Sequence, residues 1–93
     1  MTEEHFTAIV TAAEAKKNAE GWWVTQEGRH VTLYVGAEGG SSLTVNRVEA
    51  LRVDGLLVRA RSVRGEEYIL ALEDIYAGAV EPQAQTGRRA GFG

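Results

Sequence analysis

The sequence predicts a mainly β fold, in which one N-terminal helix precedes a strongly bent, five-stranded antiparallel small barrel. Short runs between Val31 and Val80 alternate apolar with polar residues, which is typical of half-buried strands. Two joins between these runs, Asp54-Gly55 and Arg64-Gly65, are short enough to fold consecutive strands back on each other. The longest run, Ser42–Asp54, changes phase midway and must therefore bend, which allows a short sheet to close on itself.

The chain has 93 residues, of which 44% are hydrophobic and 25% are charged, as in ordinary globular proteins. A chain of this length buries about 60–65% of its unfolded surface, so it has room for one core and one domain. Within that domain we expect the helix over residues 1–21 and the barrel over residues 22–82. Residues 83–93, QAQTGRRAGFG, lack periodicity and are predicted to form a flexible tail.

Composition excludes several kinds of site and partner. Without cysteine, the chain has no disulfide, no thiolate nucleophile and no cysteine zinc site. A net charge of -3 argues against non-specific nucleic-acid binding, which usually needs a basic surplus. The opening MTEEHFTAIV lacks the basic region of a secretory signal, and no apolar run approaches membrane-spanning length. We therefore expect a cytoplasmic protein without a membrane partner.

Residues 2–20 are predicted to form a helix. Thr2 can cap its N-terminus, and an apolar stripe recurs at helical spacing from Phe6 to Ala13. Lys16 and Lys17 suit the last turns, and Gly21 suits a left-handed stop. The stripe covers one open end of the barrel in one interpretation and is displayed to a partner in the other; burial against its own domain is the usual outcome.

Two adjacent tryptophans follow the helix. Neighbouring strand residues point to opposite faces, so Trp22 and Trp23 cannot both face the core if this segment is extended. One is expected in the core, and the other either under the helix or at an interface. Residues 22–25 form a candidate sixth strand, paired with the strand that comes next.

Within the run Ser42–Asp54, the apolar positions change parity at Val48 and change back at Leu51. This slip predicts a β-bulge near Asn46–Val48, because an extra residue is needed to return side chains to the core face. In the third strand, the residues predicted to face the core are Leu56, Val58 and Ala60.

The last two strands are largely apolar on both faces. Tyr68, Leu70 and Leu72 alternate with Ile69 and Ala71 in one strand, and Ile75, Ala77 and Ala79 alternate with Tyr76, Gly78 and Val80 in the other. Since one face fills the barrel, the other needs a second cover, which another copy of the chain would supply. The predicted oligomer interface comprises Tyr68, Ile69, Leu70, Ile75, Tyr76 and Val80.

This arrangement resembles the Sm-like fold, which includes bacterial Hfq. VTLYVGAEGGSSLTVNRVEALRVDG is similar to the first two strands, LLVRARSVRG to the third, and EEYILALEDIYAGAVEP to the last two. The resemblance implies a ring of identical copies, joined by pairing between Glu67–Leu72 of one copy and Ile75–Val80 of the next.

The residues through which the family binds RNA are not retained. Where Hfq has a Lys-His pair between its last two strands, this chain has Glu73-Asp74, which would repel phosphate. The Asp-x-x-x-Asn element of the first Sm motif is absent, and the Arg-Gly element is absent from its place in the second; the Arg64-Gly65 join lies earlier, before the last two strands. A second resemblance is to the PRC-type barrel, an adaptor family in which a strand followed by LED also occurs.

No arrangement of residues indicates an enzyme, a metal site or a cofactor. His5 and His30 lack metal-like spacing, and the glycine-rich segment 36–42 lacks the lysine and following helix of a phosphate loop. Adjacent carboxylates such as Glu66-Glu67 point apart on a strand and have no base or nucleophile beside them. We therefore expect a non-enzymatic protein.

A candidate nucleic-acid surface comprises Arg47, Arg52, Arg59, Arg61 and Tyr34. Arginines beside an aromatic ring bind single-stranded nucleic acid without reading its sequence. The alternative is that these arginines pair across strands with Glu49, Glu66 and Glu67. Two functions follow: a ring-forming structural or adaptor module that binds a macromolecular partner, or an RNA or single-stranded DNA binding protein.

Overall fold

A computed structural model describes residues 1–36 and 40–81. The predicted tail, residues 83–93, and the middle of the predicted connection, residues 37–39, lie outside this part of the chain. The described elements are α1 (Glu3–Ala12), β1 (Lys16–Lys17), β2 (Trp23–Val24), β3 (Val31–Gly36), β4 (Ser42–Asp54), β5 (Leu57–Ser62), β6 (Glu67–Ala71), the 3₁₀ turn η2 (Leu72–Asp74) and β7 (Ile75–Val80).

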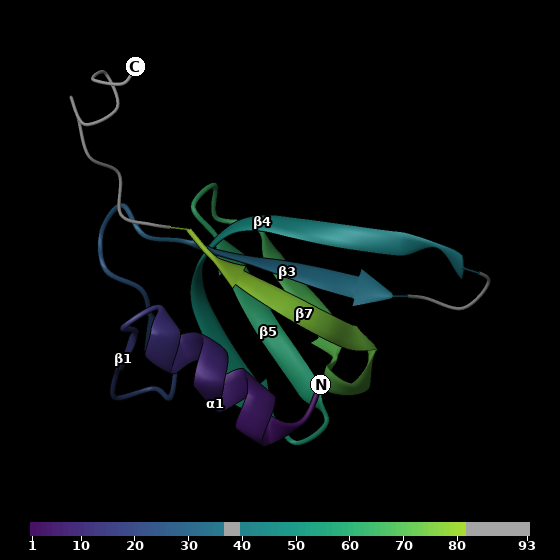
Figure 1. The fold of residues 1–93 in the computed structure, drawn as a ribbon. Helices are drawn as coiled ribbons and strands as arrows, with labels where there is room; N and C mark the ends of the chain where they lie inside the picture. Colours follow the sequence, from purple (N-terminus) through teal and green to yellow (C-terminus); the bar gives the residue numbers. More distant parts are fainter. Residues whose placement is uncertain (37–39, 82–93) are drawn as a thin grey trace, which may run out of the picture.

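The strands form one antiparallel sheet around β4, so the predicted mainly β fold with an N-terminal helix is confirmed (Figure 1). The pairings run β6-β5-β4-β3-β7. Beyond the end of β3, β2 pairs with β4, and β1 pairs with β2. Within residues 1–36 and 40–81, β6 and β7 do not pair with each other, so the sheet does not close into a barrel. It remains an open, strongly curved sheet.

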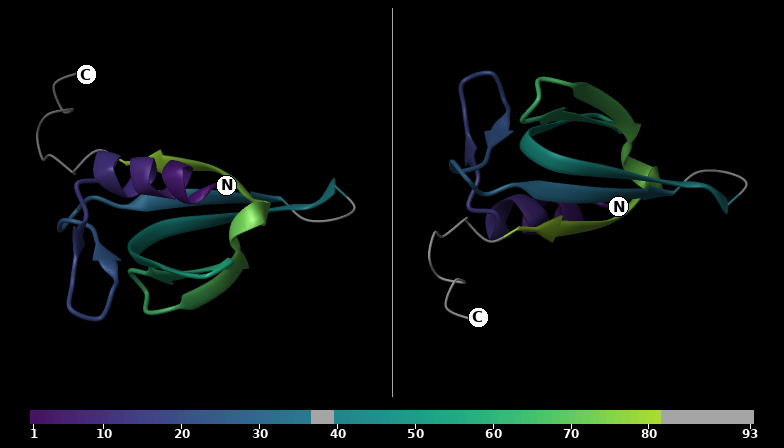
Figure 2. Two further views of the ribbon diagram at one scale, coloured as in Figure 1. Left: turned by 90° about the horizontal axis from the view of Figure 1, so that it is seen from below. Right: turned by 90° about the horizontal axis from the view of Figure 1, so that it is seen from above.

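The predicted bulge in β4 is present at the expected residues. Val31 lies opposite Val48, but Leu33 lies opposite Val45, so two β4 residues, Asn46 and Arg47, occupy the space opposite one residue of β3. Arg47 has a left-handed backbone with φ 55°. The pairing of β4 with β5 contains a second register shift, between Val48 and Ala50. These shifts bend β4 so that β5 and β6 curve away from β3 and β7 (Figure 2).

The core lies inside this curve and includes one face of the helix. The stripe residues Phe6, Ile9, Val10 and Ala13 are buried within the protein's own domain rather than displayed. The strands contribute mainly β-branched residues, which pack well on a pleated surface. The buried apolar strand and turn residues of this cluster are Val31, Leu33, Val35, Val45, Val48, Leu51, Val58, Ala60, Leu70, Leu72 and Ile75.

The helix is shorter than predicted. Thr2 caps it by accepting a hydrogen bond from the His5 N–H, but it ends at Ala12. The left-handed stop is Glu14 (φ 56°), and the Ala15 N–H donates to the Val10 carbonyl at 3.0 Å in a Schellman motif. The prediction of a helix to residue 20 is wrong because the buried stripe ends at Ala13, beyond which further turns would bury nothing.

Lys16 and Lys17 lie in β1 rather than in the last helical turns. They pair with Val24 and Trp23, and Gly21 takes its left-handed conformation (φ 90°) in this hairpin, not at the helix end. The short strand predicted at residues 22–25 exists as β2, but it pairs with β1 and with Leu51 and Ala50 of β4. The predicted pairing with the strand that follows is wrong.

Two further predictions are corrected by register. Gly55 and Leu56 form the turn between β4 and β5, since Asp54 pairs with Leu57; Leu56 is therefore 81% exposed rather than facing the core. In β7, Ile75 pairs with Val35 but Ala77 pairs with Tyr34, so Tyr76 is an extra residue.

The slip at Tyr76 reverses the faces of the rest of β7. Gly78 and Val80 pack toward the core, while Ala79 is exposed, so the regular alternation predicted for this strand, with Ile75, Ala77 and Ala79 on one face, is wrong beyond Ile75. The bulge lets β7 follow the curve of the sheet and brings Gly78 under the helix.

We predict that Glu14→Gly stabilises the protein by about 1 kcal/mol, because glycine removes the Cβ penalty at a left-handed position. Chemical denaturation measures the change. Glu14→Ala is the control: it removes the exposed ion pair with Arg29 but keeps the Cβ, so it should not stabilise. A Glu14→Gly protein less stable than Glu14→Ala would contradict the assignment of Glu14 as the helix stop.

We predict that Gly78→Ala destabilises by about 1–3 kcal/mol through overpacking, because an added Cβ would lie 2.5 Å from Ile9 Cδ1. Ile9→Val removes that methyl group. The double variant should therefore be more stable than the sum of the single changes predicts, as a double-mutant cycle measures. Gly36→Ala is the matched control, since its nearest atom, Tyr76 Cδ2, lies 3.7 Å away. Strict additivity would show that the helix does not rest on Gly78.

Candidate functional site

The two ends of the sheet each have a strand with one unused edge. β6 pairs with β5 and β7 pairs with β3; the other edge of each strand pairs with no strand of residues 1–36 and 40–81. Such edges present backbone N–H and C=O groups to another chain. Both strands also expose a large apolar side chain: Ile69 is 57% exposed and Tyr76 is 61% exposed.

The six predicted interface residues lie in different environments. Ile69 and Tyr76 are exposed on the outer surface, but Leu70 and Ile75 belong to the core and cannot contact another copy through their side chains. Tyr68 and Val80 are half-buried and pack against the same core. An interface at these edges would therefore use backbone groups together with Ile69 and Tyr76.

The structure brings three of the four predicted arginines together on the outer face of β4 and β5. Arg52 lies directly opposite Arg59, and Arg61 is the next outward residue of β5. Two of them, Arg52 and Arg59, share an acidic partner. Asp54 accepts from Arg52 Nε at 3.0 Å and from Arg59 Nε at 3.1 Å, while Glu67 accepts from Arg59 Nη1 at 3.0 Å.

Cross-strand ion pairing thus accounts for much of this surface. The hydrogen bond that Arg59 donates to Glu67 is the main reason that the pKa of Arg59 is raised above its ordinary value. Of the acids expected from the sequence, Glu67 forms such a pair; the other partner, Asp54, was not among them. The role of Asp54 as their partner becomes clear only once the register of β4 and β5 is known, because Asp54 ends β4 beside Arg52 and across from β5.

The aromatic ring beside these arginines is Trp22, which the sequence did not indicate. The Arg61 guanidinium carbon lies 4.5 Å from the centroid of a Trp22 ring, a cation–π contact. Trp23 packs against the core, so the two tryptophans do face opposite ways. The contact depends on β2 pairing with β4 at Ala50 and Leu51, which no spacing in the sequence reveals.

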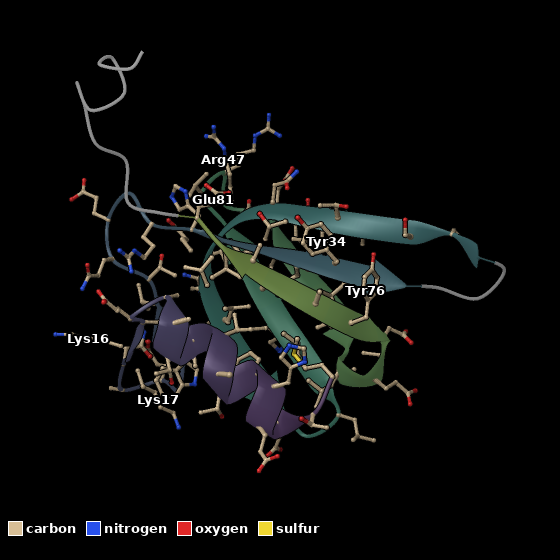
Figure 3. All side chains as sticks on the ribbon, viewed as in Figure 1. Lys16, Lys17, Tyr34, Arg47, Tyr76 and Glu81 are labelled. Carbon is tan, nitrogen blue, oxygen red and sulfur yellow. The ribbon has the colours of Figure 1, made fainter. Side chains whose placement is uncertain are left out.

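Tyr34, the predicted aromatic residue, lies away from these arginines, beside Tyr76. Its ring centroid lies 6.3 Å from that of Tyr76, and it pairs with Thr44 and Ala77 on β4 and β7. Figure 3 shows the two tyrosines close together on the side of β3 and β7. This surface forms one aromatic pair next to the unused edge of β7.

Arg47 is separated from the other arginines by the bulge and lies at a polar cleft of about 490 Å³. Figure 3 shows its side chain at the bend of β4. β4, β5, β6 and the β5–β6 turn all contribute to the lining, which consists of Thr44, Asn46, Arg47, Ser62, Arg64, Glu66 and Tyr68.

Glu66, the acidic residue of the cleft, already accepts one hydrogen bond. Tyr68 Oη donates a 3.0 Å hydrogen bond to Glu66 Oε1, and this bond is the main reason that the pKa of Tyr68 is raised. Neither Arg47 nor Arg64 has a carboxylate within 4.0 Å in the described part of the chain. The cleft therefore presents two guanidinium groups that no acid neutralises directly.

The described residues were also searched for a metal site and for a membrane-spanning helix. Residues 1–36 and 40–81 contain no group of three or more histidine or acidic residues placed to ligate a metal ion. None of their helices is long and apolar enough to cross a membrane. Comparison of the chain with protein-family models, curated proteins and solved structures finds no match.

We predict that Asp54→Asn costs at most about 1 kcal/mol, because the pairs that it weakens are partly exposed. The loss should fall toward zero near ~1 M salt, where charges are screened within about 3 Å. Denaturation at low and high salt measures both effects. Glu73→Gln is the control, since Glu73 is exposed and forms no ion pair with a described residue. A loss independent of salt would show that Asp54 acts mainly through turn geometry.

Proposed function

We propose that the protein is a non-enzymatic, Sm-like module that assembles with copies of itself and serves as a structural or adaptor unit for a macromolecular partner. The observation that carries this proposal is the pair of unused edges on β6 and β7, each beside an exposed apolar side chain, Ile69 and Tyr76. An exposed apolar edge is a liability in a monomer, and natural proteins blunt or cover it.

The strand order supports the Sm-like assignment. With β3 taken as the first strand of the fold, the order β7-β3-β4-β5-β6 places the first and fifth strands together and leaves the fourth at the far end. The second of these strands, β4, is long and bent, and the fourth and fifth are joined only by the turn Leu72–Asp74. These are the features on which the resemblance to the Sm-like family rests.

The two edges belong to different strands, so an interface between them is head-to-tail. In such an interface β6 of one copy adds to β7 of the next, and every copy keeps one edge of each kind for its neighbours. Repetition closes a ring when the rotation between copies divides a full turn. A ring also removes both exposed edges at once, which a two-fold dimer through one edge does not.

Nucleic-acid binding by the outer arginine face is the less favoured function. Arg52 and Arg59 are in direct contact with two carboxylates, those of Asp54 and Glu67, and the Arg61 guanidinium lies over the Trp22 ring. The turn between β6 and β7 adds the exposed acids Glu73 and Asp74. Phosphate binding depends on uncompensated basic charge, and little of it remains on this face.

We predict that the protein is oligomeric at micromolar concentration and that Ile69→Lys and Tyr76→Lys shift it toward monomer. A lysine at either edge places a charge where the neighbouring strand must pack. Light scattering after size-exclusion chromatography, or sedimentation velocity, measures the mass.

Leu56→Lys is the matched control for these variants. Leu56 is more exposed than either edge residue but lies in the turn between β4 and β5. The Leu56→Lys protein should therefore keep the wild-type mass. A monomeric wild-type protein would end the ring proposal, and equal dissociation by all three variants would locate the interface elsewhere.

A further inference from the structure

The conformation of Arg47 is costly for an arginine. Its φ of 55° lies in the left-handed region, which is strained for a residue with a Cβ but not for glycine. The bulge itself explains why a left-handed residue is present, and the Arg47 carbonyl is used there, accepting from the Val63 N–H at 2.9 Å. Neither fact explains an arginine side chain, since glycine would meet both requirements with less strain.

Backbone strain at a residue of this kind directs attention to what the side chain contacts. Here the side chain lines the 490 Å³ cleft together with Arg64. This volume lies within the range of small-molecule sites, about 300–1,000 Å³. The other lining groups include hydroxyl and amide donors from Thr44 and Asn46 and the ring of Tyr68, whereas no aliphatic side chain takes part. The cleft is therefore suited to a polar ligand.

The charges indicate an anion. Arg47 and Arg64 contribute two positive charges, and Glu66 contributes one negative charge whose carboxylate already accepts from Tyr68. Planar guanidinium groups bind phosphate and carboxylate oxygens with paired hydrogen bonds. Two such groups at one cleft match a phosphate monoester, which carries nearly two negative charges at neutral pH, better than a singly charged carboxylate.

We propose that this cleft binds a phosphate monoester, with Arg47 and Arg64 contacting the phosphate and Tyr68 beside the group that bears it. The volume exceeds what one phosphate needs, so the ligand is a phosphorylated organic molecule. A free nucleotide and the 5′-phosphate end of a single-stranded nucleic acid share this chemistry. This site includes neither Ile69 nor Tyr76 of the proposed interface and no residue of the outer arginine face.

The test compares three probes at about 50 mM salt, where electrostatic binding is strong: adenosine monophosphate, a 5′-phosphorylated oligo(A) and the same oligo(A) without the phosphate. Calorimetry gives the affinity, and backbone amide NMR shifts locate the site. Shifts should be confined to β4 near Arg47, the β5–β6 turn and Tyr68. Binding of the mononucleotide assigns a free nucleotide; binding of the phosphorylated oligonucleotide alone assigns a nucleic-acid end.

Arg47→Gly separates binding from stability. It should weaken phosphate binding at least tenfold, since a charged hydrogen-bond donor is lost, while the protein stays as stable as wild type or becomes more stable. Glu14→Gly is the matched control, because Glu14 is also left-handed (φ 56°) but lies at the helix end. It should leave the affinity unchanged.

Glu66→Gln tests the sign of the electrostatics. It removes the negative charge from the cleft and keeps an oxygen for the Tyr68 hydroxyl, so phosphate affinity should rise severalfold. The proposal is overturned if none of the phosphorylated probes binds, if Arg47→Gly binds as tightly as wild type, or if both oligonucleotides bind equally. Shifts centred on Arg52, Arg59 and Arg61 would likewise overturn it and favour the outer arginine face.

Discussion

The slip in β4 is the constraint on which the rest of the structure depends. A 13-residue strand with one fixed register would turn Val48 away from the face that Val45 and Leu51 share, because side chains alternate along it. The extra residues at Asn46–Arg47 and the shift at Glu49 return Val45, Val48 and Leu51 to the same core. β4 can then pair with β3 through its first half and with β2 and β5 through its second half. The curve of the sheet, and the core inside it, follow.

The same slip creates the polar cleft. Where β4 separates from regular pairing, Arg47 adopts a left-handed backbone and its side chain, with that of Arg64, lines a space between β4 and the β5–β6 turn. The fold and the candidate site thus both depend on the bulge at Arg47, but they require different properties of this residue. The fold requires only a left-handed residue, for which glycine is the least costly. The arginine is the part that the fold does not require, and this difference is the basis for assigning it a binding role.

Features that depend on the residue pattern within one segment could be predicted from the sequence. Contacts that depend on which strands pair, and in which register, could not. Parity along one segment was enough to predict the bulge at Asn46–Val48 and the opposite orientations of Trp22 and Trp23. The contact of Trp22 with Arg61 depends on β2 adding to β4, and the role of Asp54 depends on cross-strand register. The slip at Tyr76 in β7 was missed because alanine and glycine fit either face, so the sequence shows no change of parity there.

The acidic net charge of -3 does not conflict with an anion site. At physiological ionic strength charges are screened over about 8 Å, so the potential in a cleft depends on the groups that line it rather than on the whole chain. By that criterion the outer arginine face is nearly neutralised, because Arg52 and Arg59 contact two carboxylates and the Arg61 guanidinium lies over Trp22. Arg47 and Arg64, by contrast, have no carboxylate in contact among the described residues. The position of each acid, more than the number of arginines, therefore distinguishes the two surfaces. It favours a structural role for the outer arginine face and ligand binding at the bend of β4.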